Sequence, residues 1–257
     1  MAQWDPAQYE RFRAERSRPF FDLLARVPEL DVRHGADLGC GTGELTLELA
    51  RRWPAARFWG VDNSAAMLAR AQALPAQPGL GFVETDLARW RPDAPLDLAF
   101  SNAAFQWVPG HPGLLAHLAS ALAPGGVLAV QLPHNYHEPS HVAVRELLAE
   151  PAWRRRCPDP GPAPAAETPE RYLELLRQLG FAVEMWRTIY YHQLPGPEEV
   201  VEWLKGTRLR PVLSALAAAE QPAFLAELGE RMAAAYPPQP GGGVVFPFPR
   251  LFFVARR

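Results

Sequence analysis

Apolar and polar positions between residues 30 and 133 follow a regular succession of strand-like and helix-like patterns. The apolar runs of strand length fall at 32–39, 56–64, 80–86, 95–105 and 127–133. Helical spacing separates them at 43–53, 65–74 and 111–126, and we expect the last of these helices to end on Gly125–Gly126 as a C-cap. Strands that alternate with helices in this way predict an α/β fold with a parallel, doubly wound sheet.

On either side of this region the pattern of apolar and polar residues is different. Residues 6–27 show helical spacing of apolar side chains, and an apolar run at 244–257 predicts a final strand despite its two prolines. After Pro133 the predicted elements are helices at 138–156, 170–180 and 197–236, a β-rich stretch at 182–194 and a proline-rich connector at 158–169. We therefore expect a single domain, 1–257, in three parts that cover 1–28, 30–133 and 134–257.

Composition places the chain among ordinary globular proteins. Its 257 residues are 48% hydrophobic and 21% charged, and a formal net charge of −2 gives no reason to expect a nucleic-acid partner. Cys40 and Cys157 form neither a disulfide framework nor part of a metal-ligand cluster, so no metal is expected. The N-terminal segment is too polar for a signal peptide, and no stretch approaches the roughly 20 apolar residues that span a bilayer. These features predict a cytoplasmic protein with no membrane partner.

Three glycines on alternate positions, Gly39, Gly41 and Gly43, follow the first predicted strand and open the next helix. A dinucleotide fingerprint that starts at Gly39 needs a third small residue at position 44, where this chain has Glu44. A carboxylate at a helix N-terminus repels the diphosphate that such sites bind. The turn therefore favours close approach of the backbone to an uncharged or cationic ligand.

Three acids stand near the carboxyl ends of the first three strands. Asp37 adds negative charge just before the turn, Asp62 is placed to accept hydrogen bonds from both hydroxyls of a ribose, and Asp86 is placed to accept from an exocyclic amine. These acids can bind an ammonium group, a ribose and an adenine, and the turn offers no site for a phosphate. This combination suits S-adenosylmethionine (SAM), whose sulfonium is cationic. We predict SAM as the cofactor.

The ordered set ADLGCGTG, Asp62, TDLARW and LAPGGVL resembles the successive motifs of class I SAM-dependent methyltransferases over residues 30–132. The resemblance implies a Rossmann-like, seven-stranded sheet with an antiparallel last strand, and helical insertions after strand five and between the last two strands. A SAM-binding core is expected at 30–133 and substrate-side helices and strands at 134–257. Because methyl transfer needs a site without water, we expect the N-terminal helix at 1–28 to fold over the cofactor as a lid. Besides the glycines and acids, the cofactor-binding residues that the resemblance implies are Cys40, Asn63, Met67, Leu87, Ser101, Asn102, Ala103 and Trp107.

Simpler structural roles stay open for several of these residues. Asp62 can be the N-cap of the next helix, although Asn63 or Ser64 can fill that role instead. Asp86 can be a turn residue, and Met67 fits helix core better than a purine contact. Cys40 is expected to pack rather than react, and the N-terminal helix can pack at the edge of the sheet instead of covering the cofactor.

Missing motifs constrain the methyl acceptor. Enzymes that methylate exocyclic amines of nucleic acids commonly carry N-P-P-Y or D-P-P-Y after the fourth strand, where this chain has SNAAFQW. Cytosine-C5 methylation needs a nucleophilic cysteine at the same place, but Cys157 lies far downstream. The sequence also has no basic–aromatic patch typical of a nucleic-acid surface. A small-molecule acceptor is therefore favoured.

SNAAFQWVPGH and VLAVQLPHN narrow the acceptor, because they resemble the trans-aconitate 2-methyltransferase family, whose members esterify a carboxylate of a small tricarboxylic acid. The resemblance extends to WDPAQYERFRAERSRPFFDLL, HNYHEPSH, VVEWLKGTRLRP and FPRLFFVA, nearly end to end. The chemistry agrees, since a carboxylate with a pKa of about 4 is ionised at neutral pH and needs no general base. We expect the product to be a monomethyl ester of a small polycarboxylic acid, with trans-aconitate as the first candidate. Catalysis then consists of holding the carboxylate oxygen in line with the sulfonium methyl group and excluding water.

A polyanionic acceptor requires cations or neutral donors. Tyr9, His134 and Tyr136 are candidates for positioning the reacting groups. Arg210 and Arg250 are the leading candidates for carboxylate recognition, because guanidinium groups bind carboxylates in a bidentate manner. The remaining candidates for the acceptor site are Tyr191, Trp203 and Lys205, with Arg187, Tyr190, His192 and Arg208 as further donors. For the basic residues a salt-bridged surface position is an equal alternative, and Trp203 fits a core position.

Two other functions stay open. A malonyl-carrier-protein O-methyltransferase shares the core and the NAAFQW-like segment, but residues 197–236 show no basic face for an acidic carrier protein. A non-catalytic SAM-binding module is the second alternative, which the well-supplied acceptor pocket argues against. The expected partner is a small anionic carboxylate, and the expected state is a monomer or a weak homodimer.

Overall fold

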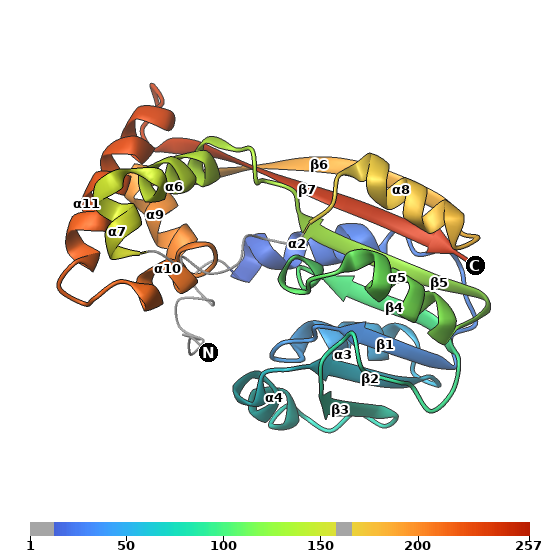
Figure 1. The fold of residues 1–257 in the computed structure, drawn as a ribbon. Coiled ribbons are helices and arrows are strands. Elements are labelled where there is room, and N and C mark those ends of the chain that lie inside the picture. The colour runs from blue at the N-terminus through green and yellow to red at the C-terminus, as the bar shows by residue number, and fades with distance from the viewer. Residues whose placement is uncertain (1–12, 158–165) are drawn as a thin grey trace. The chain divides into compact units, whose positions relative to one another are not determined.

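The computed structural model describes residues 13–157 and 166–257, with side chains from residue 17 onward, and Figure 1 shows the fold. Seven strands form one sheet in the order β3-β2-β1-β4-β5-β7-β6. Their bounds are β1 His34–Leu38, β2 Arg57–Asp62, β3 Leu80–Glu84, β4 Leu96–Asn102, β5 Leu122–Pro133, β6 Ala182–Leu194 and β7 Val244–Arg256. The pairs among β1 to β5 are parallel and β7 runs antiparallel to β5. The predicted class I methyltransferase sheet with an antiparallel last strand is confirmed.

Helices connect these strands as the sequence predicts. In the first part of the chain they are α2 Arg13–Leu24, α3 Glu44–Arg52, α4 Ala65–Gln72, the 3-10 helix η1 Phe105–Trp107 and α5 His111–Ala121. After β5 the chain forms α6 Pro139–Ala149, α7 Pro151–Arg156 and α8 Pro169–Gln178, and between β6 and β7 it forms α9 Pro197–Lys205, α10 Leu209–Ala215 and α11 Gln221–Ala235. Both predicted helical insertions are therefore present.

The chain forms two compact units. We call the first the sheet unit; its described residues are 16–133, 166–188 and 250–257. We call the second the helical unit, which is built mainly from 134–157 and 189–249. The boundaries between the units fall within β6 and β7, so each of these strands contributes residues to both. The single domain expected from the sequence stays a prediction.

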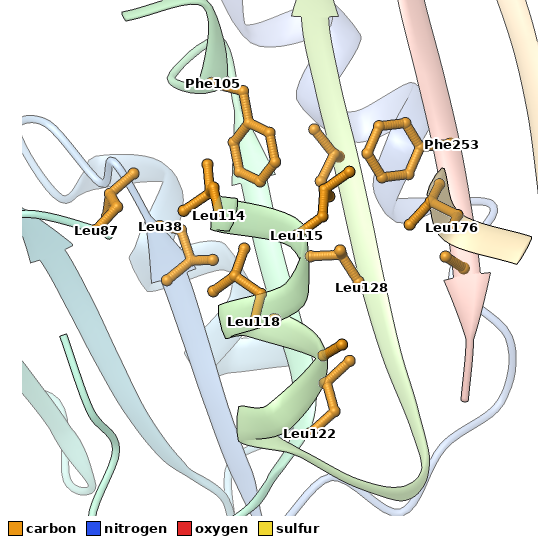
Figure 2. Close-up of a cluster of buried hydrophobic side chains, with 14 of the residues drawn as sticks. Leu38, Leu87, Phe105, Leu114, Leu115, Leu118, Leu122, Leu128, Leu176 and Phe253 are labelled. Carbon is orange, nitrogen blue, oxygen red and sulfur yellow. The ribbon is translucent and has the colours of Figure 1, made fainter. Parts of the chain in front are cut away.

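Helices cover both faces of the sheet unit. On one face, leucines of α5 and α8 pack with Leu38, Leu128 and Phe253 in a buried hydrophobic cluster, as Figure 2 shows. Along β4 the side chains alternate, so Ala99 joins this cluster while Phe100 faces the other side. There Phe100 contacts Phe20 of α2 with ring centroids 4.9 Å apart. Burial on both faces is the arrangement expected of a doubly wound sheet.

The helical unit has a hydrophobic core of its own. Residues of α6, α7, α9, α10, α11 and the first half of β7 form one buried cluster, which includes Val144, Trp153, Trp203 and Phe224. Trp153 and Phe224 meet edge to face with centroids 5.1 Å apart, and the Trp153 indole donates to Glu227 at 2.8 Å. The indole N–H therefore has a partner, so the large ring can be buried at little cost.

Two sequence expectations about helix ends are wrong. The helix predicted at 111–126 ends at Ala121, because Leu122 already pairs with Leu96 at the start of β5. Gly125 and Gly126 lie in the irregular part of that strand, where a Cβ on Gly126 would come within 2.7 Å of the Leu96 carbonyl oxygen. The two glycines allow the backbones of β4 and β5 to approach closely, and they do not cap a helix.

The helix predicted at 138–156 is broken into α6 and α7. Glu150, between the two helices and directly before Pro151, has extended backbone angles, φ −63° and ψ 140°. Proline disfavours helical geometry in the residue that precedes it, which explains the break.

Among the described residues, no helix combines the length and the apolar character needed to cross a membrane.

Candidate functional site

The glycine turn joins β1 to α3 at the carboxyl end of the sheet. Gly39, Gly41 and Gly43 all have positive φ angles, of 81°, 55° and 76°. The backbone N–H groups of Gly39 and Cys40 donate to the Val61 carbonyl of β2, at 2.7 and 3.1 Å. These bonds hold the turn against the neighbouring strand. Positive φ at three alternate positions explains why the sequence has glycine at each of them.

Asp62, the last residue of β2, is bonded to the same turn. Its carboxylate accepts from the N–H of Gly41 and from the N–H of Ser64, both at 2.9 Å. Ser64 is the N-cap of α4, since its hydroxyl accepts from Met67 N–H at 3.4 Å. The cap role left open for Asp62 is therefore filled by Ser64. A carboxylate has about four acceptor positions, so Asp62 keeps capacity for ribose hydroxyls.

Asp37 lies inside β1, 3% exposed, and accepts a 2.6 Å hydrogen bond from the Thr46 hydroxyl of α3. Burial raises the pKa of Asp37 from 3.8 to about 7, while the Thr46 bond lowers it and the charge of Asp62 raises it further. A cation placed beside Asp37 would stabilise its ionised form. The acid is therefore poised to change charge when a cationic ligand binds.

The end of β4 forms the other side of this region. The Ser101 hydroxyl donates to the Leu38 carbonyl at 2.7 Å and fixes β4 against β1. Ala103, with φ 55°, has the left-handed geometry that a non-glycine residue rarely adopts, and its N–H donates to the Gln131 carbonyl at 2.9 Å. Beyond it Trp107 is 48% exposed. Such strain clusters at functional sites.

The remaining predicted cofactor residues differ in exposure. Asp86 and Asn63 are exposed, and Asp86 accepts from the Ala88 N–H at 2.8 Å in a local turn. Leu87 and Met67 are buried, so their side chains are packed within the fold. Cys40 is buried against Leu68, Ala71 and Phe82, and burial raises the pKa of its thiol, which keeps it protonated. Cys40 packs, as predicted.

A cationic group that carries a ribose fits the residues around the turn. A Cβ on Gly41 would meet no atom within 4 Å, so the backbone there is open to a ligand. The Asn102 Oδ1 atom at the end of β4 is buried and has no hydrogen-bond partner in the part of the chain that the structure describes. A buried acceptor without a donor is unfavourable, and a bound ligand with hydroxyl or amine groups can satisfy it.

Of the two leading candidates for carboxylate recognition, Arg250 belongs to the sheet unit and Arg210 to the helical unit. Arg250 stands on β7 opposite Pro133 of β5, is 3% exposed and donates to Gln131 Oε1 at 3.3 Å. Gln131 in turn pairs with Asn102 of β4. The Gln131 Nε2 atom is buried and has no hydrogen-bond partner among residues 17–157 and 166–257. The register therefore brings a guanidinium, a free amide donor and Asn102 to the same edge of the sheet.

The candidates in the helical unit have different surroundings. Lys205 is paired with Glu202 one turn earlier at 2.5 Å, and Trp203 is 1% exposed within the core. The Trp203 ring lies tilted against the His192 ring, with the centroids 4.7 Å apart. This burial agrees with the core position left open for Trp203. Arg210 is half-buried, and burial lowers the pKa of its guanidinium.

Other candidates lie on the surface or outside the described residues. Tyr191 is 66% exposed on β6, and Tyr136 is 36% exposed. The His134 N–H donates to the Pro249 carbonyl at 2.9 Å. Tyr9 and residues 1–12 of the predicted lid lie outside the described residues. Further along α2, Phe20 packs against the sheet, which agrees with the alternative of a packing helix for that part.

Comparison with known proteins decides the family. A family model described as a methyltransferase domain matches residues 36–126. Trans-aconitate 2-methyltransferases of Escherichia coli O139:H28 and of Shigella flexneri are each 47% identical to this chain over 257 residues, which is 100% of the chain and 99% of each relative. The chain belongs to the trans-aconitate 2-methyltransferase family. It is therefore a SAM-dependent methyltransferase, as predicted, and SAM is its cofactor.

Solved structures agree with the fold of this family. A SAM-dependent methyltransferase of Mesorhizobium loti matches with a TM-score of 0.54 at 24% identity, covering 93% of this chain and 97% of that one. A phosphoethanolamine N-methyltransferase of Haemonchus contortus, in complex with phosphomonomethylethanolamine and S-adenosylhomocysteine, matches with a TM-score of 0.55 at 16% identity. The match covers 93% of this chain and 52% of that one. At these identities the likeness concerns the fold alone.

Sequence analysis missed two polar residues of the site. Thr46 holds Asp37, and its place in an amphipathic helix gave no indication of that bond. Gln131 joins Arg250 inside the apolar run VLAVQLP, where a single amide is itself conspicuous. A polar side chain in a strand buried on both faces requires partners, and this argument could have found Gln131.

Proposed function

We propose that this protein methylates one carboxylate of trans-aconitate and forms a monomethyl ester. Full-length identity to trans-aconitate 2-methyltransferases supports this acceptor. The structural observation that carries the proposal is the buried pair of Arg250 and Gln131 at the edge where β4 and β5 end, because it offers a cation and an unused amide donor to a carboxylate. A guanidinium and an amide together suit the planar, two-oxygen geometry of that group.

The cofactor site supports the same chemistry. When bound, SAM supplies an electrophilic methyl group on a sulfonium. We assign Asp62 to the ribose hydroxyls, Asp86 to the adenine amine and Asp37 to the positive charge of the amino-acid part. Their negative charges attract a cationic cofactor and disfavour a diphosphate. Asn63, Met67, Leu87, Ser101, Asn102, Ala103 and Trp107 complete the proposed lining.

The acceptor needs no general base. Its carboxylate is ionised at neutral pH, so its oxygen forms the new bond to carbon while the carbon–sulfur bond breaks, and no proton has to be removed. The residues of this chain then act by orienting the carboxylate and keeping water away. A strong bond from Arg250 to the reacting oxygen would reduce the nucleophilicity of that oxygen. We therefore assign Arg250 the role of orienting the carboxylate.

An assay with methyl-labelled SAM tests the proposal. The purified protein is offered trans-aconitate, other di- and tricarboxylic acids and a malonyl carrier protein. Label on trans-aconitate that is released by mild base supports the ester. Label on the carrier protein alone would establish the carrier-protein function instead, and SAM binding without transfer to any acceptor would indicate the binding module. A cytoplasmic location, a monomer or weak homodimer, the absence of a nucleic-acid partner and the lid at 1–28 stay predictions.

A further inference from the structure

His111 is a buried histidine of the sheet unit that has no part in the mechanism proposed above. It is the first residue of α5 and is 1% exposed. Its Nε2 atom lies 2.9 Å from the Phe105 carbonyl oxygen of η1, and its Nδ1 atom lies 2.5 Å from the Tyr172 hydroxyl of α8. All three residues belong to the sheet unit, so their arrangement does not depend on where the helical unit lies.

The partners of His111 fix the position of its proton. A backbone carbonyl can only accept, so Nε2 carries the hydrogen and donates to Phe105. In the neutral ring Nδ1 is then an acceptor, and the Tyr172 hydroxyl donates to it. The same hydroxyl accepts from the Glu167 N–H at 3.3 Å. A directed chain of hydrogen bonds therefore runs from Glu167, just before α8, through Tyr172 and His111 to the backbone of η1.

Aromatic packing restricts the movement of these side chains. Tyr172 is completely buried, and its ring stacks on His111 with the centroids 5.5 Å apart and lies 5.6 Å from the Phe253 ring. The Phe105 ring is also completely buried, 5.8 Å from the imidazole of His111. Phe105 and Phe253 both belong to the hydrophobic cluster in Figure 2. Because side chains in such a densely packed core have little freedom, His111 can hold η1 at a fixed distance from α5 and α8.

The backbone of η1 is connected to the proposed cofactor site through the residues that precede it. Ala104 abuts the first glycine of the turn, since a Cβ on Gly39 would lie 2.1 Å from the Ala104 Cβ. The Ala103 carbonyl accepts from Gln106 Nε2 at 2.6 Å, and this bond ties the left-handed Ala103, with φ 55°, to η1. A shift of η1 would therefore displace both alanines relative to the glycine turn.

We propose that His111 and Tyr172 are positioning residues of the SAM site. Tyr172 orients the imidazole, and the bond from His111 to the Phe105 carbonyl sets the place of η1. The inference rests on the cofactor site proposed above, and not on the identity of the acceptor. Strained geometry like that of Ala103 persists only where the surrounding structure over-determines it, and the bond from His111 is one of the constraints. Neither positioning residue is assigned a contact with SAM.

Two variants of His111 separate its bond to η1 from its bond to Tyr172. The amide of a glutamine reaches about as far as Nε2, so His111→Gln can keep a donor for the Phe105 carbonyl. The amide of an asparagine reaches only as far as Nδ1, so His111→Asn can keep an acceptor for Tyr172 but loses the bond to Phe105. In calorimetric titrations SAM affinity should fall about tenfold in His111→Asn and stay within about threefold of the wild type in His111→Gln.

Leu118→Ala is the matched control for stability. It removes a buried side chain of the same hydrophobic cluster, two turns further along α5. The cavity should lower the unfolding temperature at least as much as His111→Asn does, and SAM affinity should equal that of the wild type. Tyr172→Phe leaves the donor of His111 in place but removes the group that orients it. We therefore expect an intermediate loss of SAM affinity, about three- to fivefold.

The comparison of the two His111 variants decides between a positioning role and a merely structural one. A SAM affinity of His111→Asn that equals or exceeds that of His111→Gln would overturn the proposal, because the bond to η1 would then have no effect. A loss of affinity in Leu118→Ala as large as that in His111→Asn would also overturn it, since reduced stability alone would explain the loss. If His111→Asn does not fold, Tyr172→Phe decides, and wild-type SAM affinity in that variant overturns the proposal.

Asp62→Ala distinguishes failure of this inference from failure of the proposed cofactor site. If Asp62→Ala binds SAM as the wild type does, the proposed site is wrong and the inference falls with it. If Asp62→Ala weakens SAM binding and His111→Asn does not, the site is right and the inference is wrong. No acceptor is present in these titrations, so their outcome is independent of whether trans-aconitate is methylated.

Discussion

The Asp62 carboxylate accepts a 2.9 Å hydrogen bond from the backbone N–H of Gly41 and so joins the end of β2 to the glycine turn. One acid thus shapes the loop at the proposed cofactor site. The structure contains a second acid with the same type of bonding. Asp97 at the start of β4 accepts from the N–H groups of Arg33 and His34, both at 2.9 Å, at the opposite end of the strands.

Asp62→Ala should weaken SAM binding at least about 30-fold, because loss of hydrogen bonds to a charged acceptor costs roughly 2 kcal/mol or more. Calorimetric titration with SAM measures this. Asp97→Ala is the control. It should reduce the free energy of unfolding by about 1–3 kcal/mol and leave SAM affinity unchanged. Equal effects of both substitutions on SAM affinity would show that Asp62 acts only through stability.

Measurements of SAM affinity and of the free energy of unfolding should also distinguish the roles of the glycines in the turn. A Cβ on Gly39 would lie 2.1 Å from the Ala104 Cβ, whereas a Cβ on Gly41 would meet nothing within 4 Å. Gly39→Ala should therefore destabilise the protein strongly. Gly41→Ala should cost only the about 1–2 kcal/mol of left-handed backbone strain, yet abolish measurable SAM binding by occupying the ligand's space. Normal SAM affinity in Gly41→Ala would place the cofactor elsewhere.

Asp37 should make stability depend on pH without cofactor. Its folded pKa of about 7 lies above the ordinary value of 3.8, so between these values the folded protein keeps a proton that the unfolded chain has released. The stability from this group is complete below about pH 4 and is lost as pH rises to about 7. Asp37→Asn should therefore be more stable than the wild type at pH 8, by up to about 4 kcal/mol, with a smaller difference at pH 5. Urea unfolding at both pH values measures it.

The same acid should couple SAM binding to proton release. A bound cation favours ionised Asp37, so SAM affinity of the wild type should rise about tenfold from pH 6 to pH 8. In Asp37→Asn the affinity should change little over this range. Calorimetry in buffers of different ionisation enthalpy reports the released proton directly. A flat wild-type profile would mean that the cofactor's charge does not reach Asp37.

Arg250→Lys should raise the KM for trans-aconitate about 10- to 100-fold with a smaller effect on SAM affinity. Lysine keeps the charge but cannot hold Gln131 and a carboxylate in one plane. Steady-state kinetics with varied acceptor provides the measurement. Arg256→Lys, at the exposed far end of β7 opposite Val127, is the control and should leave KM unchanged. An unchanged KM in Arg250→Lys would remove Arg250 from the acceptor site.

Tyr172→Phe should lower the free energy of unfolding by about 1–3 kcal/mol. His111 Nε2 donates to the Phe105 carbonyl at 2.9 Å, so Nδ1 is the acceptor in its 2.5 Å bond with the Tyr172 hydroxyl. Without that hydroxyl, a buried acceptor loses its partner. Tyr191→Phe, which alters an exposed hydroxyl, should change stability by less than about 0.5 kcal/mol in the same unfolding experiment.

Much of the cofactor region could be predicted because its determinants are local. Apolar periodicity located β1, β2 and β4, and turn chemistry located Gly39, Gly41, Gly43 and the acids that follow their strands. The break before Pro151 and the pairing of Lys205 with Glu202 were also within reach of local rules. The wrong cap at Gly125–Gly126 had another cause, since pairing with Leu96 overrode a local preference.

The sequence alone determined the alternation of strands and helices between residues 30 and 133 and the glycine turn after the first strand, because turns and periodicity depend on neighbouring residues. Only the tertiary structure decided which polar groups are buried. Arg208, Arg210 and Arg250 look alike in the sequence, yet Arg250 is joined to Gln131 and Arg208 is enclosed without an acid beside it. Burial is produced by side chains distant along the chain, and it is burial that turns a charge from a solvated surface group into a binding determinant.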